Sequence, residues 1–420
     1  MKTYWIIFFI FLLSCEENAQ PISKELHDQF EKYQESALTI RRFKHNDIEK
    51  LITKHKKNTN FVISEAGKSF EKRTIYQVKY GNGPIRILLW SQMHGNEATA
   101  TMALFDIFNF LGASGDSFDG FRKDLASKAT LYFIPMLNPD GAERWQRRTA
   151  QEIDMNRDAL RLVCPESRIL KNLQQTLKPD FGYNLHDQDP RISAGISKNL
   201  ATISFLASAY DHDRSMNEVR KKSVQLISKM NKDLQQFIPG QVARYPDDHE
   251  PRAFGDNIQK WGTSLILIES GGYKNDPEKM TIRKLNFVAM LSSFNHIIYK
   301  TFLKETISDY EAIPENKNFH HDLIIRNATV NAFGNPYIID IGIARNEVNS
   351  ITSKGYTYKS VISDVGDLST FTGLEEIDAD GAVITDTKDS LILPRVTLPA
   401  NFVLKQKNGN KIIINNGFKQ

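Results

Sequence analysis

The alternation of short apolar runs with amphipathic segments constrains the fold of this chain most strongly. Four apolar runs have the length of buried strands, at residues 85–90, 130–134, 183–186 and 265–268. Apolar side chains recur at helical spacing in residues 98–110, 216–237 and 282–303. Strands that alternate with helices favour a sheet whose two faces are covered by helices. We therefore expect an α/β fold with a mixed, mostly parallel sheet.

Polar side chains of a few types follow these apolar runs. His94 follows the first run and Asn138 follows the second, whereas His186 and Glu269 close the third and fourth. In open α/β sheets, ligands bind beyond the carboxyl ends of the strands. The sequence therefore predicts a binding or catalytic site at that edge of the sheet.

Three of these side chains have the chemistry of metal ligands. His94 and Glu97 are three residues apart where a strand turns into a helix, so one turn can hold both on one side. His186 supplies a third candidate ligand from a distant part of the chain. Two histidines and one glutamate leave one position of a tetrahedral zinc ion open for water, which is typical of a catalytic site.

Several short signatures in a fixed order resemble the zinc carboxypeptidases, the carboxypeptidase A-like or funnelin family. They lie within about residues 60–300 and are His94-x-x-Glu97, Asn138-Pro139-Asp140-Gly141, Arg147, Asp154-Met155-Asn156-Arg157, His186 and Glu269. The resemblance implies the family's fold and one zinc ion per chain, held by His94, Glu97 and His186.

The resemblance also implies roles for the remaining signature residues. Glu269 matches the family's catalytic glutamate, which acts as the general base toward a zinc-activated water. Arg147, or less favourably Arg148, matches the arginine that stabilises the oxyanion. Asn156 and Arg157 match the pair that binds the terminal carboxylate of a peptide substrate.

Three regions depart from the family pattern where the substrate is chosen. Tyr245 is the nearest counterpart of the family's mobile tyrosine, which has no clear match. Asp256 lies close to the position that lines the specificity pocket, and Gly255 at the base of that pocket implies no strong selection for charge. Residues 187–189 read Asp-Gln-Asp, so we expect a polar and acidic channel floor.

Near residue 316 the sequence pattern changes from alternating strands and helices to short strand-like runs. Short strand-like runs, among them residues 322–330, 337–344, 382–385, 390–393 and 411–414, are separated by Gly, Asn and Asp. We expect a small β-rich domain at residues 320–420 after a catalytic domain at 59–310 and a lead-in at 16–58. No histidine follows His321, which makes a second metal site in the last domain improbable.

The first 15 residues are typical of a signal segment. A charged start and an apolar stretch at residues 5–13 end at Leu-Leu-Ser before Cys15, which resembles a bacterial lipoprotein signal with the lipid on Cys15. The alternative is a plain secretory signal in which Cys15 is incidental. Either interpretation predicts an exported protein in the periplasm or at the outer membrane. Cys164 is the other cysteine, so the mature chain has no internal disulfide.

Composition fits an ordinary globular protein, with 40% hydrophobic and 25% charged residues. A formal net charge of +4 over 420 residues indicates no nucleic-acid partner. The sequence thus predicts an exported zinc metallocarboxypeptidase that acts on peptides. The alternatives are a zinc deacylase of the succinylglutamate-desuccinylase or aspartoacylase kind, a cell-wall peptide hydrolase, and a non-catalytic binding protein.

Overall fold

A computed structural model describes residues 22–332, 334–351 and 355–420. Cys15 and the rest of the predicted signal segment lie outside these residues. Among the helices of the described part of the chain, none is both long and apolar enough to cross a membrane.

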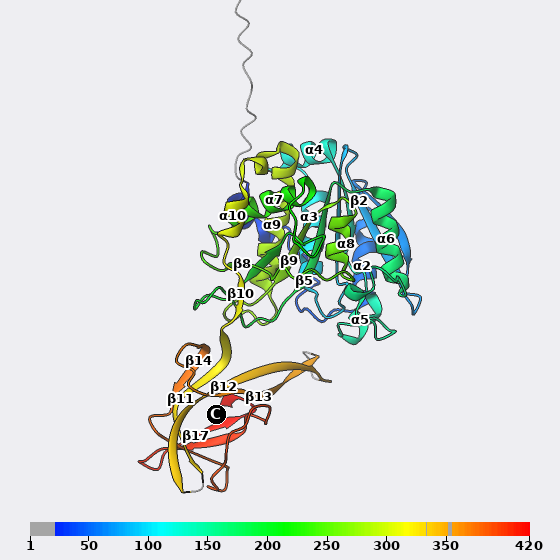
Figure 1. The fold of residues 1–420 in the computed structure, drawn as a ribbon. Helices are drawn as coiled ribbons and strands as arrows, with labels where there is room; N and C mark the ends of the chain where they lie inside the picture. The colour runs from blue at the N-terminus through cyan, green and yellow to red at the C-terminus, as the bar shows by residue number, and fades with distance from the viewer. Residues whose placement is uncertain (1–21, 333, 352–354) are drawn as a thin grey trace, which may run out of the picture.

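An eight-stranded mixed sheet forms the centre of the first part of the described chain (Figure 1). Its order is β1-β2-β4-β3-β5-β9-β7-β8. The inner pairs β4/β3, β3/β5 and β5/β9 are parallel, whereas β1/β2, β2/β4 and β9/β7 are antiparallel. The strands are β1 (Phe61–Lys68), β2 (Thr74–Tyr80), β3 (Ile85–Ser91), β4 (Ala129–Ile134), β5 (Phe181–Asp187), β7 (Ile203–Leu206), β8 (Val242–Arg244) and β9 (Ser264–Ser270).

Helices cover both faces of this sheet, because its inner strands are apolar on both sides. Residues of α3, α7 and α9 share one apolar core with Tyr183 and Ile266 of the sheet. Residues of α6 and α8 share a second core with Trp90 and Leu265. The predicted α/β class is therefore confirmed. The helices are α1 (Ser23–Asp28), η1 (Phe30–Lys32), α2 (His45–His55), α3 (Thr99–Gly112), α4 (Asp119–Lys128), α5 (Pro139–Arg144), η2 (Met155–Arg157), α6 (Pro165–Leu177), α7 (Glu218–Leu234), α8 (Phe254–Lys260), α9 (Met280–Tyr299), η3 (Thr301–Lys304) and α10 (Ile307–Glu311).

The segment predicted as a lead-in packs into the main core. A buried ion pair joins Arg283 of α9 to Asp106 of α3 at 2.5 Å, and both side chains are fully buried. The same guanidinium donates to the carbonyl oxygens of Glu35 (3.0 Å) and Leu38. Asp106 in turn accepts the backbone N–H of Glu35 at 2.7 Å. Arg283 thus links residues 35–38 to α3 and α9, two helices that pack against the sheet.

A second eight-stranded sheet follows residue 319 within the described residues, and it has its own apolar core. The chain reaches it through β10, which pairs antiparallel with β6 of the first part. The β-rich C-terminal region is therefore confirmed, while its boundaries stay a prediction. The strands are β6 (Ile192–Ala194), β10 (Asn316–Asn318), β11 (His320–Ala332), β12 (Asn335–Asn349), β13 (Tyr356–Gly366), β14 (Thr372–Asp378), β15 (Val383–Thr385), β16 (Phe402–Lys405), β17 (Lys411–Asn415) and β18 (Phe418–Lys419).

One strand-like run of this region was predicted wrongly. Residues 390–393 form a single bridge, from Leu391 to Thr385, instead of a strand. The Asp386 carboxylate accepts the backbone N–H groups of Lys388 and Ser390, both at 2.8 Å, and turns the chain. Pro394 follows at once and has no N–H for a ladder.

A long arm of β12 and β13 reaches back from the second sheet toward α5 (Figure 1). Glu347 of the arm pairs with Arg41 at 2.7 Å and with Arg42 at 3.2 Å. The Arg42 guanidinium lies 4.6 Å from the centroid of the Trp145 ring. Asn349 donates to the carbonyl oxygen of Arg144 at 3.0 Å. The arm therefore braces the turn that leads from α5 toward Arg147.

Candidate active site

The alternation of side chains along two neighbouring strands, β5 and β9, builds the candidate site. Side chains alternate between the two faces of a strand, so Asn184 and His186 of β5 share a face that Tyr183 does not. Glu269 lies opposite His186 in the parallel pairing of β9 with β5. These polar side chains line a cavity of about 470 Å³ at the carboxyl ends of the strands.

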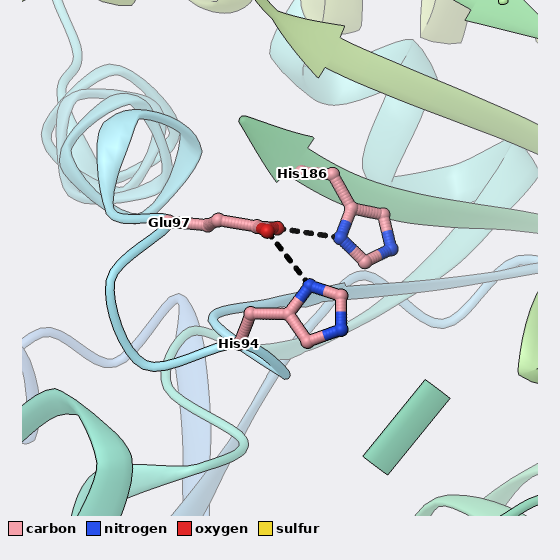
Figure 2. Close-up of side chains that lie close together, drawn as sticks. All are labelled: His94, Glu97 and His186. Atoms are coloured by element: carbon pink, nitrogen blue, oxygen red, sulfur yellow. Dashed lines mark hydrogen bonds and ion pairs between the residues drawn. The ribbon is translucent and has the colours of Figure 1, made fainter. Parts of the chain in front are cut away.

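The three predicted metal ligands converge in this cavity. Figure 2 shows the Glu97 carboxylate between the two imidazoles, with the Nδ1 atoms of His94 and His186 turned toward it. Glu97 Oε1 lies 2.8 Å from His94 Nδ1, and Glu97 Oε2 lies 2.6 Å from His186 Nδ1. The ligand atoms of all three residues lie within 4.8 Å of one another, and all three residues are buried.

A tight turn after β3 presents His94 and Glu97 on one side. The backbone N–H of Glu97 donates to the His94 carbonyl oxygen at 3.1 Å. A Cβ atom on Gly95 would lie 2.0 Å from the backbone of Gly141, so only glycine fits this approach. Asn138 caps α5 by accepting the Gly141 N–H and also donates to the Met93 carbonyl oxygen. The Asn-Pro-Asp-Gly signature therefore holds in place the turn that carries His94 and Glu97.

Asp154 orients the first histidine. Its Oδ1 atom lies 3.2 Å from His94 Nε2, the ring nitrogen that faces away from Glu97. A carboxylate on the outer nitrogen of a ligating histidine fixes the tautomer and raises its basicity. The sequence signature contains Asp154, but reasoning from the sequence assigned it no role, because the contact spans 60 residues.

The charges of the cluster favour an ionised carboxylate. Burial alone raises the pKa of Glu97, but the two imidazoles outweigh burial and hold that pKa far below its ordinary value. Burial likewise lowers the pKa of His94, yet Glu97 and Asp154 outweigh it and the net pKa rises. For His186, burial prevails and its pKa falls. Glu97 is thus available as an anionic ligand at neutral pH.

Glu269 lies beside this cluster in a different state. Burial raises its pKa well above the ordinary value, and the nearby Glu97 and Asp187 carboxylates raise it further. Its Oε2 atom has no hydrogen-bond partner among the described residues. A carboxyl group with a raised pKa and a free oxygen can take up a proton inside the cavity.

Arg147 contacts the cluster from the opposite wall. Its Nη1 atom donates to Glu97 Oε1 at 3.1 Å, and its Nε atom donates to Asp154 at 3.0 Å. The neighbouring Arg148 donates instead to the carbonyl oxygen of Glu152 and does not line the cavity. The geometry therefore favours Arg147 over Arg148 as the arginine of the site.

The predicted carboxylate clamp lies on the same wall of the cavity. Asn156 accepts the backbone N–H of Phe254 through Oδ1 at 2.9 Å, which fixes its amide. The Nε atom of Arg157 lies 3.1 Å from Glu250, which Arg252 also binds. Two guanidiniums thus share one carboxylate, and this group keeps a net positive charge at the cavity wall.

Tyr245, Gly255 and Asp256 line the cavity as well. Tyr245 is 37% exposed, so its ring reaches the opening. Asp256 is buried, and burial raises its pKa to about 6 although His249 lies 3.1 Å from its Oδ1 atom. These positions agree with the substrate-facing roles that the sequence predicts for Tyr245 and Asp256, which stay predictions.

The acidic run after His186 does not leave free negative charge on the cavity floor. Asp187 lies 3.3 Å from Lys279 and accepts the Thr99 hydroxyl. Asp189 forms a bidentate pair with Arg191. The predicted floor is therefore polar, but Asp187 is paired with a distant lysine and Asp189 with an arginine two residues along the chain.

Reasoning from the sequence did not predict that β10, the strand that leads to the second sheet, contributes to the cavity. Asn316 of β10 donates to Gln188 at 2.7 Å and accepts the Ser204 hydroxyl at 2.7 Å. Asn316, Lys317 and Asn318 line the cavity. The only local signal is a short polar run before the β-rich region. This run reaches the site because β10 pairs with β6, which lies more than a hundred residues earlier in the chain.

Comparisons with known proteins relate part of this chain to one family. Residues 45–178 match the family described as zinc carboxypeptidase. Carboxypeptidase 2 of Trichophyton rubrum is 27% identical over 153 residues, which are 36% of this chain and 28% of that protein. Carboxypeptidase 2 of Trichophyton tonsurans is 25% identical over a stretch with the same shares. The chain thus spans less than a third of the length of these relatives.

A solved structure supports the fold. The crystal structure of a metallo-carboxypeptidase from Burkholderia cenocepacia aligns with a TM-score of 0.51 and 16% identity, and it covers 62% of this chain and 70% of that chain. At this identity the likeness concerns the fold, which agrees with the fold predicted from the sequence.

Proposed function

We propose that the protein is a metallocarboxypeptidase, a proposal supported by the match of residues 45–178 to the zinc carboxypeptidase family. It removes the C-terminal residue of a peptide or peptide-like substrate. The observation that carries this proposal is the convergence of His94, Glu97 and His186 beside Glu269 in one cavity.

The donor set fits one zinc ion per chain. Two imidazole nitrogens and one carboxylate oxygen already face one another, and Asp154 holds the outer nitrogen of His94. When bound, zinc polarises the scissile carbonyl group and lowers the pKa of a coordinated water toward ~7.

Glu269 acts as the proton carrier in this proposal. Its raised pKa lets it accept a proton from the attacking water and then deliver it to the departing amine. Its buried position excludes bulk water, which would otherwise compete for that proton. No other described carboxylate combines these features with a place directly opposite His186 in the sheet.

Arg147 stabilises negative charge on the carbonyl oxygen of the substrate. Its guanidinium is 44% exposed on one side and hydrogen-bonded to Glu97 and Asp154 on the other. A preorganised cation of this kind stabilises an oxyanion more than it stabilises the neutral carbonyl group.

The terminal carboxylate of the substrate binds at Asn156 and Arg157. The fixed amide of Asn156 and the net positive Arg157–Glu250–Arg252 group favour an anion at this wall. Tyr245, at the opening, covers the bound terminus. This arrangement measures one residue from the chain end, as an exopeptidase requires.

A panel of substrates tests the proposal. Zinc-loaded protein is incubated with free-acid peptides, the same peptides with an amidated C-terminus, cell-wall peptides and N-acyl amino acids, and products are identified by mass spectrometry. We expect release of single C-terminal residues from the free acids and at least a hundred-fold slower release from the amides. Turnover of N-acyl amino acids alone would replace this function with a deacylase. Cleavage confined to cell-wall peptides would narrow the substrate.

We also propose that the chain is exported and lipid-anchored through Cys15, on the sequence pattern of residues 1–15. Expression with a radiolabelled fatty acid should label the wild type and leave Cys15→Ser unlabelled. Equal labelling of both proteins, or recovery of unlabelled wild type from the soluble fraction, would contradict the anchor.

A further inference from the structure

Unpaired polar atoms line the deep end of the cavity. Asn184 is fully buried on β5, two residues before His186 and on the same face of the strand. Both its amide nitrogen and its amide oxygen lack a hydrogen-bond partner among the described residues. The hydroxyl of Ser208, 1% exposed, lacks one as well. All of these residues line the cavity.

These atoms belong to one place. Gly255, at the start of α8, also lines the cavity, and a Cβ atom there would lie 3.0 Å from the Ser208 hydroxyl and 3.7 Å from the Asn184 amide nitrogen. Two residues along a strand correspond to about 7 Å, so this place lies about one side-chain length below the His94–Glu97–His186 cluster. A side chain of the substrate's last residue spans that distance.

Buried polar atoms without partners carry the full free-energy cost of leaving water. A ligand that pairs them recovers this free energy, whereas a ligand without the matching group does not. Pockets that hydrogen-bond a substrate group therefore reject analogues without it far more strongly than apolar pockets discriminate by size.

The chemistry of these atoms selects among substrate side chains. Asn184 offers a donor group, its amide nitrogen, and an acceptor, its amide oxygen, and a primary carboxamide offers the complementary acceptor and donor. An ammonium group leaves the Asn184 donor facing a cation. A carboxylate leaves the Asn184 oxygen facing an anion. An aliphatic side chain leaves every one of these atoms unpaired.

We propose that the cavity prefers a C-terminal residue with a primary carboxamide side chain, that is glutamine or asparagine, and that Asn184 and Ser208 recognise this group. The inference rests on the proposed carboxypeptidase function and names its substrate class. Gly255 keeps the space beside Ser208 open for the amide.

The test uses peptides that differ only in their last residue, which is Gln, norleucine, Lys or Glu. We expect kcat/KM for Gln to exceed that for norleucine at least ten-fold in the wild type. Asn184→Leu, which keeps the volume, should reverse this ratio, and Asn184→Asp should shift preference toward Lys. Ser208→Ala should lower the ratio by a smaller factor. Zinc content and thermal melting of each variant establish that it is folded.

A binding arm separates this inference from the proposed function. Calorimetry measures the binding of free glutamine, norleucine, lysine and glutamate to zinc-loaded wild type and Asn184→Leu. Selective glutamine binding that Asn184→Leu abolishes, without hydrolysis of any peptide, would keep the subsite and overturn the carboxypeptidase. Hydrolysis with no preference for Gln, or a preference unchanged in Asn184→Leu and in Ser208→Ala, would overturn the subsite and keep the carboxypeptidase.

Discussion

The two sheets of this protein differ in whether their polar side chains are buried or exposed. In the first sheet, β5 and β9 are buried along nearly their whole length, yet they end in His186 and Glu269. In the second sheet, β12 is exposed toward both of its ends, and the large side chain of Ile338 is 65% exposed. Charged groups are therefore buried in the first sheet and exposed to solvent in the second.

This difference explains where chemistry is located. Burial and neighbouring charges shift the pKa values of Glu97 and Glu269 in opposite directions within one cavity. In the described part of the second sheet, no histidine, cysteine, aspartate or glutamate belongs to a metal-like cluster. The second sheet contributes instead through its connections, which are β10 at the cavity and Glu347 on the arm.

Replacement of Glu269 by Gln should have the largest effect. The variant keeps the volume and hydrogen-bonding shape but cannot take up a proton, so we expect kcat/KM to fall about 10⁴-fold. Steady-state hydrolysis of a peptide substrate measures this change. Glu376→Gln, in the second sheet, is the matched control and should leave kcat/KM within two-fold. Comparable losses in both variants would contradict the contrast between the sheets.

Removal of the buried arginine Arg283 should be the largest change in stability. Arg283→Met leaves the Asp106 carboxylate buried without its cation, so the free energy of unfolding should fall by about 3–5 kcal/mol. Chemical denaturation followed by circular dichroism measures it. The double variant Arg283→Met with Asp106→Leu should recover most of the loss. Lack of recovery would mean that the two side chains do not act as a pair.

Asp256 should make stability depend on pH. Its pKa is raised by burial to about 6 in the folded protein, above about 3.9 in the unfolded chain. The protonated form therefore stabilises the fold below pH 4, and this contribution is lost as the pH rises through 6.

Asp256→Asn removes that titration while keeping an oxygen for His249 and the Glu250 N–H. The variant should melt at the wild-type temperature at pH 4 and be about 1–3 kcal/mol more stable at pH 7.5. Thermal melts across this range provide the check. A variant that is destabilised equally at both pH values would show that the carboxylate is satisfied as an anion.

The arm of the second sheet should have an intermediate effect. Glu347→Gln removes the charge shared by Arg41 and Arg42, and we expect a loss of about 1 kcal/mol in stability. We also expect a small fall in kcat with KM unchanged, because the arm braces the turn before Arg147. Ile338→Ala, on the same strand and with a side chain 65% exposed, is the control. An unchanged kcat would restrict the arm to a structural role.

An exposed ion pair in the second sheet should matter least. Arg345 pairs with Glu375, whose side chain is 59% exposed. Glu375→Gln should change the free energy of unfolding by no more than about 1 kcal/mol and should do so less at high salt. Denaturation at low and high ionic strength measures this difference. A loss as large as that of Arg283→Met would erase the contrast between the two sheets.

The sequence predicted the central elements of the fold well. The runs at residues 85–90, 130–134 and 265–268 are strands, because long buried apolar runs have few alternatives in an α/β protein. The short strands β7 and β8 at the edge were not predicted, since four and three residues carry no periodicity. The predicted helix at 282–303 ends earlier, because Lys300 adopts a left-handed conformation with φ of 58°.

The candidate site was predictable where the spacing of residues along the sequence indicates their chemical role. His94 and Glu97 are three residues apart and meet in space, and His186 and Glu269 follow from the ends of their strands. Arg147, 50 residues after Glu97, was predicted from the order of the family signatures. Asn184 was missed although the alternation that exposes His186 to the cavity also exposes Asn184. Lys279 was missed because its pairing with Asp187 spans 92 residues and no local pattern encodes it. Arg191 was missed although it lies only two residues after its partner Asp189.

Zinc stoichiometry tests the central claim most directly. Wild type, His186→Ala and the control His321→Ala are dialysed against dilute zinc, and bound metal is measured by mass spectrometry beside hydrolysis of one peptide. We expect one zinc ion per chain and activity in wild type and His321→Ala, and loss of both in a folded His186→Ala. One tightly bound zinc ion in a folded His186→Ala protein that still hydrolyses the peptide would contradict it.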